Sequence, residues 1–586
     1  MLTEPLGVQK TQEVGGEGHD ELNEQVNGEF QAGRLKSFIS EWEKITSDPQ
    51  ILDIVEHCHI EFVGDICPQQ RFSLGRTHFN LKETEIIDNE IYTNLLPKGI
   101  IKQIEYDKDV FLSPIFIRPK KNGEFRIILN LKRLNEDVVH HHFKMNSFER
   151  VVSLVKNGIF MASVDLRHAY YSVHIAEEHQ KYLCFKWGDK IFQYTCLPNG
   201  LASAPRLLTK LLKPVFAKLR SLGYVNIGYI DDSLLFDDSK ETVGLMENLG
   251  FIIHKDKSVF KPSKQITFLG NIIDFEKMLV ILPKEKQYLI KKECENLSLK
   301  TRTSIPEVAR VIGLLVSSFS AVDYGKLFYR NLERAKIEAL NNFRGNVDAF
   351  MHITSEMKLD LFWWIENIYA QVRIIARGNP DITMQTDASM IGWDALLESK
   401  ETRGRWSITE AKKHINYLEM SSVYFALKSF KDKIKGKHVK VFCDNSTAVA
   451  YINNMGGCKS ADYNEIAKSI WAWCIDNDVW ISCTHLPGKF NVEADCLSRS
   501  FNDQLEWKLN EVVFESIVKV WGKPDIDHFA SRLNNQVECY CAFKPDPYAK
   551  HINAFLVDWV KFNCVYLFPP FSLLGSCTQK LIMDKA

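Results

Sequence analysis

Short runs of apolar residues alternate with segments of helical spacing from about residue 106 to residue 275. Apolar runs rich in β-branched and aromatic residues are typical of buried strands. Their alternation with helices predicts a mixed α+β domain. The strands are expected at residues 113–118, 125–130, 161–165, 183–187 and 225–229.

The pattern changes twice after this region. Lys, Glu, Leu and Arg recur at helical spacing over residues 283–370, and an apolar run at 382–386 opens a second α/β region. Residues 1–33 hold seven acidic residues, one basic residue and few large apolar groups, so they cannot repay the entropy of ordering. The predicted domains are a disordered acidic tail (1–33), a helical N-terminal extension (34–94), an α+β core (95–282), a helical region (283–370), an α/β domain (371–500) and an accessory C-terminal module of unknown role (501–586).

The composition is that of a globular multidomain protein, with 586 residues, 45% of them hydrophobic and 25% charged. A net charge of −1 means that local basic surfaces would have to meet any polyanionic partner. The 14 cysteines form no Cys-x-x-Cys pair, which disfavours a zinc knuckle and favours a reducing intracellular compartment, cytoplasm or nucleus. We expect no signal peptide and no membrane association, because no apolar run is long enough.

Two adjacent acids, Asp231 and Asp232, lie between apolar arms at residues 225–236, the pattern of a hairpin with a charged tip. A third acid, Asp165, ends another apolar run. Carboxylates gathered at strand ends raise one another's pKa unless a cation neutralises them, and oxygen ligands suit Mg²⁺. Taken alone, adjacent acids at a turn are more often turn formers or helix caps.

With these acids in this order, residues 95–275 resemble the fingers and palm of reverse transcriptases. The resemblance is carried by Tyr-Ile-Asp-Asp at 229–232 and Asp-Leu-Arg-His-Ala-Tyr at 165–170. It implies a right-hand polymerase with fingers, palm and a helical thumb or connection. In that family, residues matching Asp165, Asp231 and Asp232 hold two catalytic metal ions.

Four further residues are candidates for nucleotide binding by the same resemblance. Lys121 and Arg126 lie in a segment similar to the fingers hairpin that grips the triphosphate. Asn199 lies in a Leu-Pro-Asn-Gly block that touches nucleotide and template, and Tyr170 matches the aromatic residue that rejects a 2′-OH. The alternatives are a solvated basic face, a Pro-Asn-Gly turn and a core tyrosine. The segment 129–135 departs from the Asp-Tyr-Arg of many relatives.

A second set of four acids lies farther along the chain, on a predicted strand, helix, strand and helix: Asp387, Glu419, Asp444 and Asp495. Their order resembles that of the acids in the ribonuclease H domain. Hydrolysis of an RNA phosphodiester by two metals needs such a carboxylate cluster. His485 could shuttle a proton, since its ordinary pKa lies near neutrality. Taken one at a time, the acids could instead be turn residues or charges on a helix surface, and His485 could be a structural histidine. The resemblance assigns the metal ligands to Asp387, Glu419, Asp444 and Asp495.

The end of the chain is similar to a segment that follows the ribonuclease H domain in DIRS-like, Gypsy-related retrotransposons. The similarity lies in Asp-His-Phe-Ala-Ser-Arg at 527–532 and Phe-Pro-Pro-Phe at 568–571. No protease signature, integrase finger or recombinase domain is recognisable. The chain's end soon after Phe571 suggests a truncated reading frame.

The sequence therefore predicts an α+β multidomain enzyme, a right-hand polymerase followed by an α/β ribonuclease H-like domain. Its expected function is RNA-directed DNA synthesis for a retrotransposon, with hydrolysis of the RNA strand of RNA/DNA hybrids. The expected cofactor is Mg²⁺, two ions per active site, with Mn²⁺ as a substitute. The expected partners are an RNA template, a DNA primer, an RNA/DNA hybrid and deoxynucleoside triphosphates. The alternatives are a domesticated or inactive nucleic-acid-binding copy and a cellular polymerase related to maturases or telomerase.

Overall fold

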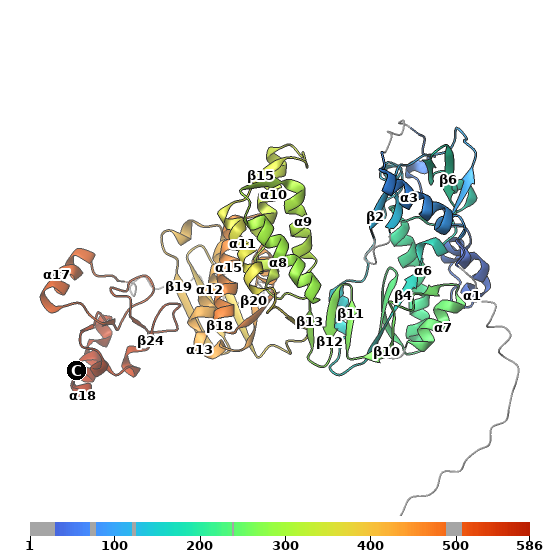
Figure 1. Ribbon diagram of the computed structural model, residues 1–586. Coiled ribbons are helices and arrows are strands. Elements are labelled where there is room, and N and C mark those ends of the chain that lie inside the picture. Colours follow the sequence, from blue (N-terminus) through green and yellow to red (C-terminus); the bar gives the residue numbers. More distant parts are fainter. Residues whose placement is uncertain (1–29, 71–77, 120–124, 237–238, 488–506, 586) are drawn as a thin grey trace, which may run out of the picture. The chain divides into compact units, whose positions relative to one another are not determined.

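The computed structural model describes residues 30–70, 78–119, 125–236, 239–487 and 507–585. The chain divides into two compact units, Met1–Lys277 and Met278–Ala586. In Figure 1 the first unit runs from blue to green and the second from green to red. No helix in the described part of the chain has both the length and the apolar character that crossing a bilayer requires.

The first unit contains an antiparallel sheet at its centre. Its strands are β4 (Met161–Arg167), β7 (Val225–Tyr229), β8 (Asp232–Phe236), β9 (Ile252–Ile253) and β10 (Val259–Ser263). β4 pairs with β8, and β8 forms a hairpin with β7. Helix α6 (Ala204–Ser221) packs closely on this hairpin, because a Cβ added at Gly228 would lie 2.1 Å from the Phe216 ring.

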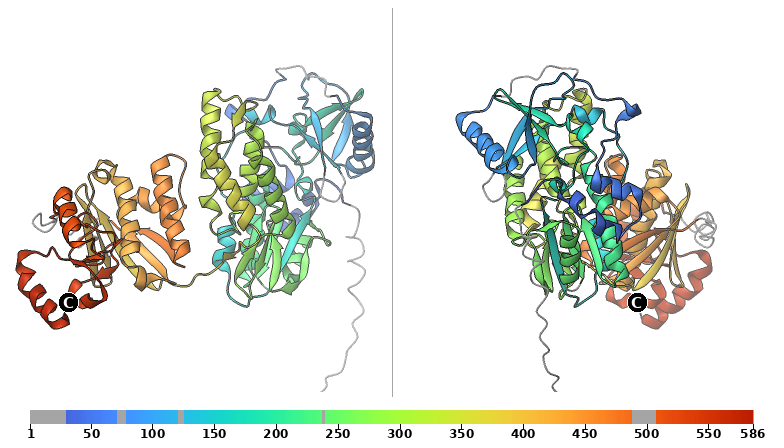
Figure 2. Two further views of the ribbon diagram at one scale, coloured as in Figure 1. Left: turned by 60° about the vertical axis from the view of Figure 1, so that its left-hand side comes forward. Right: turned by 90° about the vertical axis from the view of Figure 1, so that its right-hand side faces the viewer.

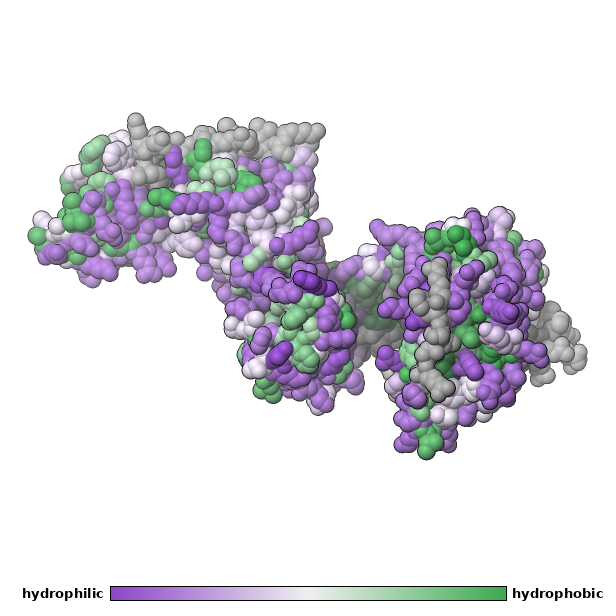
Figure 3. All heavy atoms as spheres, turned by 90° about the horizontal axis from the view of Figure 1, so that it is seen from above, coloured by the Kyte–Doolittle hydropathy of each residue, from purple (hydrophilic) through white to green (hydrophobic). Residues whose placement is uncertain are grey.

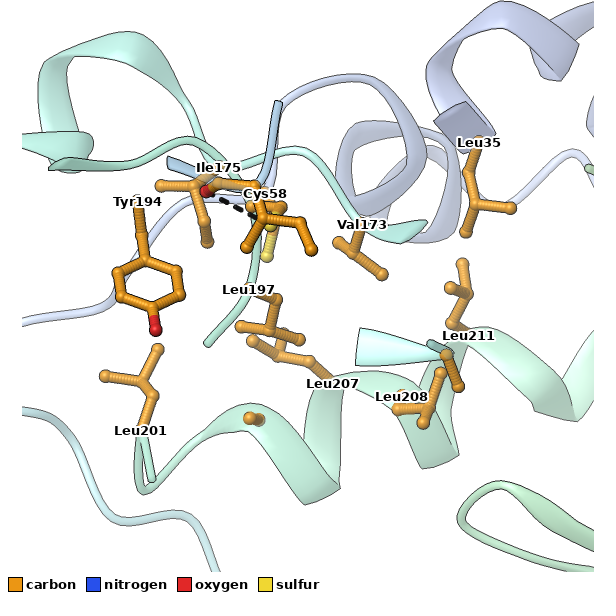
Figure 4. Close-up of a cluster of buried hydrophobic side chains, with 14 of the residues drawn as sticks. Leu35, Cys58, Val173, Ile175, Tyr194, Leu197, Leu201, Leu207, Leu208 and Leu211 are labelled. Carbon is orange, nitrogen blue, oxygen red and sulfur yellow. Dashed lines mark hydrogen bonds between the residues drawn. The ribbon is translucent and has the colours of Figure 1, made fainter. Parts of the chain in front are cut away.

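Smaller β elements and N-terminal helices complete the first unit. Trp42 of α1 (Ile39–Glu43) is fully buried and donates a hydrogen bond from its indole to the carbonyl oxygen of Leu249 at 3.0 Å, which ties the N-terminal segment to the core. The apolar core continues from this segment to α6, as Figure 4 shows for Leu35 and Leu211. The other strands are β1 (Ile101–Ile104), β2 (Ile115–Pro119), β3 (Phe125–Leu129), β5 (Cys184–Trp187), β6 (Lys190–Tyr194), β11 (Gln265–Phe268) and β12 (Asn271–Asp274).

The expected strands all occur, with ends that differ by up to two residues. The strand expected to stop at Asp165 continues to Arg167, because its last residues pair with β9. The expected disordered tail lies mostly outside the described residues. Its last four residues differ from the expectation, because Phe30 is buried in the core and the backbone N–H of Gly33 donates to the carbonyl oxygen of Tyr171.

The second unit begins with β13 (Leu279–Ile281), which is followed by four α-helices and a short strand pair, β14 (Arg302–Ser304) with β15 (Phe350–His352). Their buried positions recur at helical spacing, such as Val308, Ile312 and Leu315 on one helix. These helices are α8 (Lys284–Ser298), α9 (Ile305–Val316), α10 (Arg330–Asn342) and α11 (Ser355–Asn367).

A five-stranded sheet follows, visible in orange and yellow in Figure 2. Its strands are β17 (Ile382–Ala388), β18 (Gly392–Leu397), β19 (Lys400–Arg405), β20 (His438–Cys443) and β21 (Trp480–His485). The order is β19–β18–β17–β20–β21, antiparallel among the first three strands and parallel among the last three. Met420 and Val423 of helix α12 (Ile415–Ser429) share its core with Val441.

The described residues 507–585 form a small module with its own core around Trp559 and Cys577. It contains α17 (Glu511–Trp521), α18 (Leu574–Asp584) and two short parallel strand pairs. Large apolar side chains such as Val520 and Phe571 are exposed here, and hydrophobic residues are visible at the left end of the surface in Figure 3. All cysteines in the described ranges are free thiols.

Candidate active sites

The first site is built where β4 meets the tip of the β7–β8 hairpin. Asp165 and Asp232 are register partners across the antiparallel pair, so their side chains lie on one face of the sheet. The hairpin turns at Ile230 and Asp231, and Ile230 adopts a left-handed φ of 57°. A β-branched residue is strained in this conformation, and such strain concentrates at functional sites.

Burial and like charge act together on these carboxyls. Burial raises the pKa of Asp232 to about 7, and the charges of Asp231 and Asp165 add to the rise. Burial also raises the pKa of Asp231, while the cations of Lys257 and Arg126 oppose that rise. Lys257 Nζ lies 3.8 Å from an Asp165 carboxylate oxygen. Three crowded hard-oxygen donors with one nearby lysine fit a divalent cation.

Three of the four predicted nucleotide-binding residues lie in the described part of the chain. Tyr170 is part-buried, and its pKa rises to about 12, first through burial and then through the charge of Asp231. Asn199 donates a hydrogen bond to the Tyr171 hydroxyl at 3.2 Å. Arg126 lies on β3 and is exposed. Lys121 lies outside the described residues.

Asn135 was not among the predicted site residues. Its amide donates to the carbonyl oxygen of Gly200 and accepts from the backbone N–H of Ala202, both at 2.9 Å. These two bonds fix the loop that carries Asn199. Asn135 and Gly200 also line an open cavity of about 290 Å³. A single asparagine gives no signal of partners 65 and 67 residues away.

The second site lies at the ends of the central strands of the five-stranded sheet. Asp387 is on β17, Asp444 follows β20, and Glu419 projects from α12. Burial raises the pKa of Glu419 to about 9, and the charges of Asp387 and Asp444 raise it further. His485 is exposed and pairs in register with the residue before Asp444. The fourth predicted acid, Asp495, lies outside the described residues.

Two residues beside this site were also missed. One ligand atom each from Cys443, Glu419 and Asp444 lie within 4.8 Å of one another. Asp394 lies opposite Asp387 in register, is fully buried, and has no hydrogen-bond partner on either carboxylate oxygen. Burial raises the pKa of Asp394 to about 8, with further contributions from Glu401 and Asp387. The sequence could have indicated Asp394, because it is the one acid in the otherwise apolar run 392–397.

The C-terminal module attaches to the five-stranded domain through a part-buried ion pair. Arg532 donates to both carboxylate oxygens of Glu410, at 2.8 and 2.9 Å, and to the carbonyl oxygen of Arg405 at 2.7 Å. Its guanidinium also lies 4.6 Å from the centroid of the Phe425 ring. Lys544 forms a second ion pair with Glu401. The module is therefore packed onto the edge of this domain.

Comparison with known proteins gives the class of the first site. Residues 118–273 match the family described as "Reverse transcriptase (RNA-dependent DNA polymerase)". The chain therefore contains a reverse transcriptase domain, a family that generally uses divalent metal ions.

The chain's relatives include polyproteins of viruses and transposons. It is 23% identical to Polyprotein P3 of Commelina yellow mottle virus over 67% of this chain and 21% of that protein. It is also 23% identical to the Transposon Tf2-3 polyprotein of Schizosaccharomyces pombe, over 69% of this chain and 30% of that protein. The putative enzymatic polyprotein of Cassava vein mosaic virus is 22% identical over 73% of this chain and 67% of its own length. The chain thus spans about a fifth to a third of the first two relatives.

Among solved structures, the foamy viral protease-reverse transcriptase in complex with RNA/DNA hybrid aligns with a TM-score of 0.46 and 16% identity. The alignment covers 78% of this chain and 60% of that chain.

Proposed function

We propose that this chain is an RNA-directed DNA polymerase of a retrotransposon with a linked ribonuclease H. One observation carries the proposal. Asp165 and Asp232 lie opposite each other on neighbouring strands, next to Asp231, within the segment that matches the reverse transcriptase family. We assign the fingers and palm to residues 95–282 and the thumb or connection to residues 283–370. The DIRS-like subtype belongs to the proposal through the similarity at 527–532.

In the polymerase site, Asp165, Asp231 and Asp232 would hold two Mg²⁺ ions. When bound, these ions would activate the primer 3′-hydroxyl and stabilise the charge on the transferred phosphate. Lys121 and Arg126 would bind the triphosphate of the incoming nucleotide, because lysine supplies a point charge and arginine a bidentate fork. The hydroxyl of Tyr171 positions Asn199, whose loop is also fixed by Asn135.

The sugar would lie against Tyr170 in this arrangement. Its ring is part-buried and close enough to Asp231 for that carboxylate to raise the pKa of the Tyr170 hydroxyl. An aromatic ring fixed beside the metal-binding acids leaves little room for a 2′-hydroxyl. We therefore assign Tyr170 as the group that favours deoxynucleotides.

In the second site, Asp387, Glu419, Asp444 and Asp495 would hold the metal ions of a ribonuclease H in residues 371–500. The raised pKa of Glu419 supports this assignment, because a cation would offset the burial and like charge that raise it. His485 would transfer a proton at the exposed edge of the site. The substrate would be the RNA strand of the hybrid that the polymerase makes.

The proposal is tested with the full chain, an RNA template, a DNA primer and deoxynucleoside triphosphates in Mg²⁺. We expect primer extension followed by shortening of the template strand, and loss of both when Mg²⁺ is chelated. Mn²⁺ should restore both reactions. Nucleic-acid binding without extension or cleavage in either ion would favour an inactive, domesticated copy and contradict the proposal.

A further inference from the structure

The second site contains a thiol among its carboxylates. Cys443 is fully buried at the end of β20, and its Sγ lies 3.7 Å from a Glu419 carboxylate oxygen, to which the thiol donates a hydrogen bond. A ligand atom of Asp444 completes a group whose members lie within 4.8 Å of one another. Among the described residues, no other three His, Cys, Asp or Glu side chains are gathered this closely.

This geometry matches the ligand shell of a thiophilic cation. Zn²⁺ binds thiolate sulfur at about 2.3 Å and carboxylate oxygen at about 2.0–2.2 Å, so a tetrahedral site holds sulfur and oxygen about 3.5–3.7 Å apart. The observed separation of Cys443 Sγ and the Glu419 oxygen is 3.7 Å. The two atoms are therefore already spaced as neighbouring ligands of one ion.

Burial and the charge of Glu419 raise the pKa of the Cys443 thiol well above its ordinary value, so the free site holds the thiol and a bound cation would displace its proton. The backbone N–H of Asn445 donates to Cys443 Sγ at 3.4 Å, and Asn445 is the N-cap of α14 (Ser446–Asn453). An N–H donor and a helix N-terminus both stabilise negative charge on sulfur. Asp444 is only part-buried, so an ion can reach the group from solvent.

We propose that Cys443, Glu419 and Asp444 form a binding site for a thiophilic divalent cation such as Zn²⁺, which inhibits the nuclease by occupying carboxylates that Mg²⁺ needs. The inhibitory part of this inference rests on the proposed ribonuclease H function, whereas the binding part does not. Thiolate favours Zn²⁺ over Mg²⁺, which prefers six oxygen ligands. The cavity beside Asp165 and Asp232 has no cysteine or histidine among its described lining residues, so the polymerase should resist the same ion.

Binding is measured first, with Co²⁺ as a spectroscopic probe on the metal-free full chain. A cobalt–thiolate bond gives a charge-transfer band in the near ultraviolet. We expect this band in the wild-type protein and in Cys483→Ser, the matched control, which removes a buried thiol on the neighbouring strand β21. Cys443→Ser and Cys443→Ala should lose the cysteine-dependent band. An unchanged band in both Cys443 variants would overturn the site, and circular dichroism checks that each variant is folded.

Inhibition is then measured by titrating Zn²⁺ into hybrid cleavage and primer extension assays at fixed Mg²⁺. Because even second-shell changes alter metal affinity by about 10–100-fold, loss of a direct ligand should raise the inhibitory Zn²⁺ concentration about 100-fold. We expect this shift for Cys443→Ser in cleavage, relative to its own zinc-free rate, and no shift in extension. Equal zinc sensitivity of wild type and Cys443→Ser would overturn the inference. A Cys443-dependent cobalt band without any Mg²⁺-dependent cleavage would instead contradict the proposed nuclease function and leave the cation site standing.

Discussion

Asp165 and Asp232 lie directly opposite each other on β4 and β8, 67 positions apart in the chain. Their pairing places two carboxyls on one face of the sheet, and the hairpin turn adds Asp231. The site thus depends on the register of one antiparallel strand pair. A register shift of one residue would turn one of the two acids to the opposite face.

The raised pKa of Asp232 predicts a pH-dependent stability in the absence of metal. A carboxyl whose pKa rises from 3.8 to about 7 on folding stabilises the fold fully below pH 4, and this contribution is lost as the pH rises toward 7. Thermal unfolding of the chelated full chain should therefore show the transition of the first unit falling across this range. Mg²⁺ should raise this transition more at pH 8 than at pH 5, and Asp232→Asn should flatten both effects. An identical pH profile in wild type and variant would contradict the assignment.

The buried carboxyl of Asp394 predicts that the second unit also loses stability as the pH rises. Its pKa rises from 3.8 to about 8, and neither carboxylate oxygen has a partner, so folding costs more as the pH rises through this range. Asp394→Asn should stabilise the second unit by more than about 1 kcal/mol at pH 8 and have little effect at pH 4. Chemical denaturation at the two pH values measures this. Asp462→Asn, at an acid whose side chain is 57% exposed, is the control and should not stabilise the second unit at pH 8.

Tyr170→Ala should increase ribonucleotide incorporation, because removal of the ring opens space beside Asp231. The measurement is the ratio of extension rates with ribonucleotides and deoxynucleotides on one RNA template. Tyr170→Phe keeps the ring and should keep the wild-type ratio. If Tyr170→Ala also keeps that ratio, the residue does not select the sugar.

The ion pair of Arg532 and Glu410 should hold the C-terminal module in place. Arg532 is 12% exposed, and removing one partner of a buried pair costs about 3–5 kcal/mol. Because this pair is only part-buried, Arg532→Met should destabilise the second unit by about 2 kcal/mol and expose residues 507–585 to proteolysis. Lys413→Met breaks a mostly exposed pair with Asp462 and should have little effect on stability, because water and salt screen such a pair. Equal costs for the two variants would show that the module does not depend on Arg532.

Local pattern was sufficient to predict the strands and the hairpin. The segment 225–236 has apolar arms on both sides of its two acids, and β7 has the bounds that this pattern predicts. Strand ends were less certain, because the extension of β4 past Asp165 depends on pairing with β9, which is distant in the chain. The sequence also indicated that Asp387, Glu419 and Asp444 follow one another on strand, helix and strand.

Contacts between distant segments could not be predicted in the same way. Asn135 is an ordinary polar residue in the sequence, and Arg532 stands there only as part of the 527–532 resemblance. The contacts of both depend on partners that only the fold brings near. Cys443 reads as one more apolar strand residue until α12 places Glu419 beside it. Asp394 is unusual only because its side chain is fully buried.

A substitution in one proposed active site should abolish the activity of that site and leave the other activity intact. One paired measurement tests this most directly. Asp232→Asn and Glu419→Gln are compared in primer extension on a poly(rA)/oligo(dT) substrate and in cleavage of a preformed RNA/DNA hybrid. We predict that Asp232→Asn abolishes extension and retains cleavage, whereas Glu419→Gln abolishes cleavage and retains extension. Loss of both activities in either variant, or full extension by Asp232→Asn, would contradict two separate carboxylate sites.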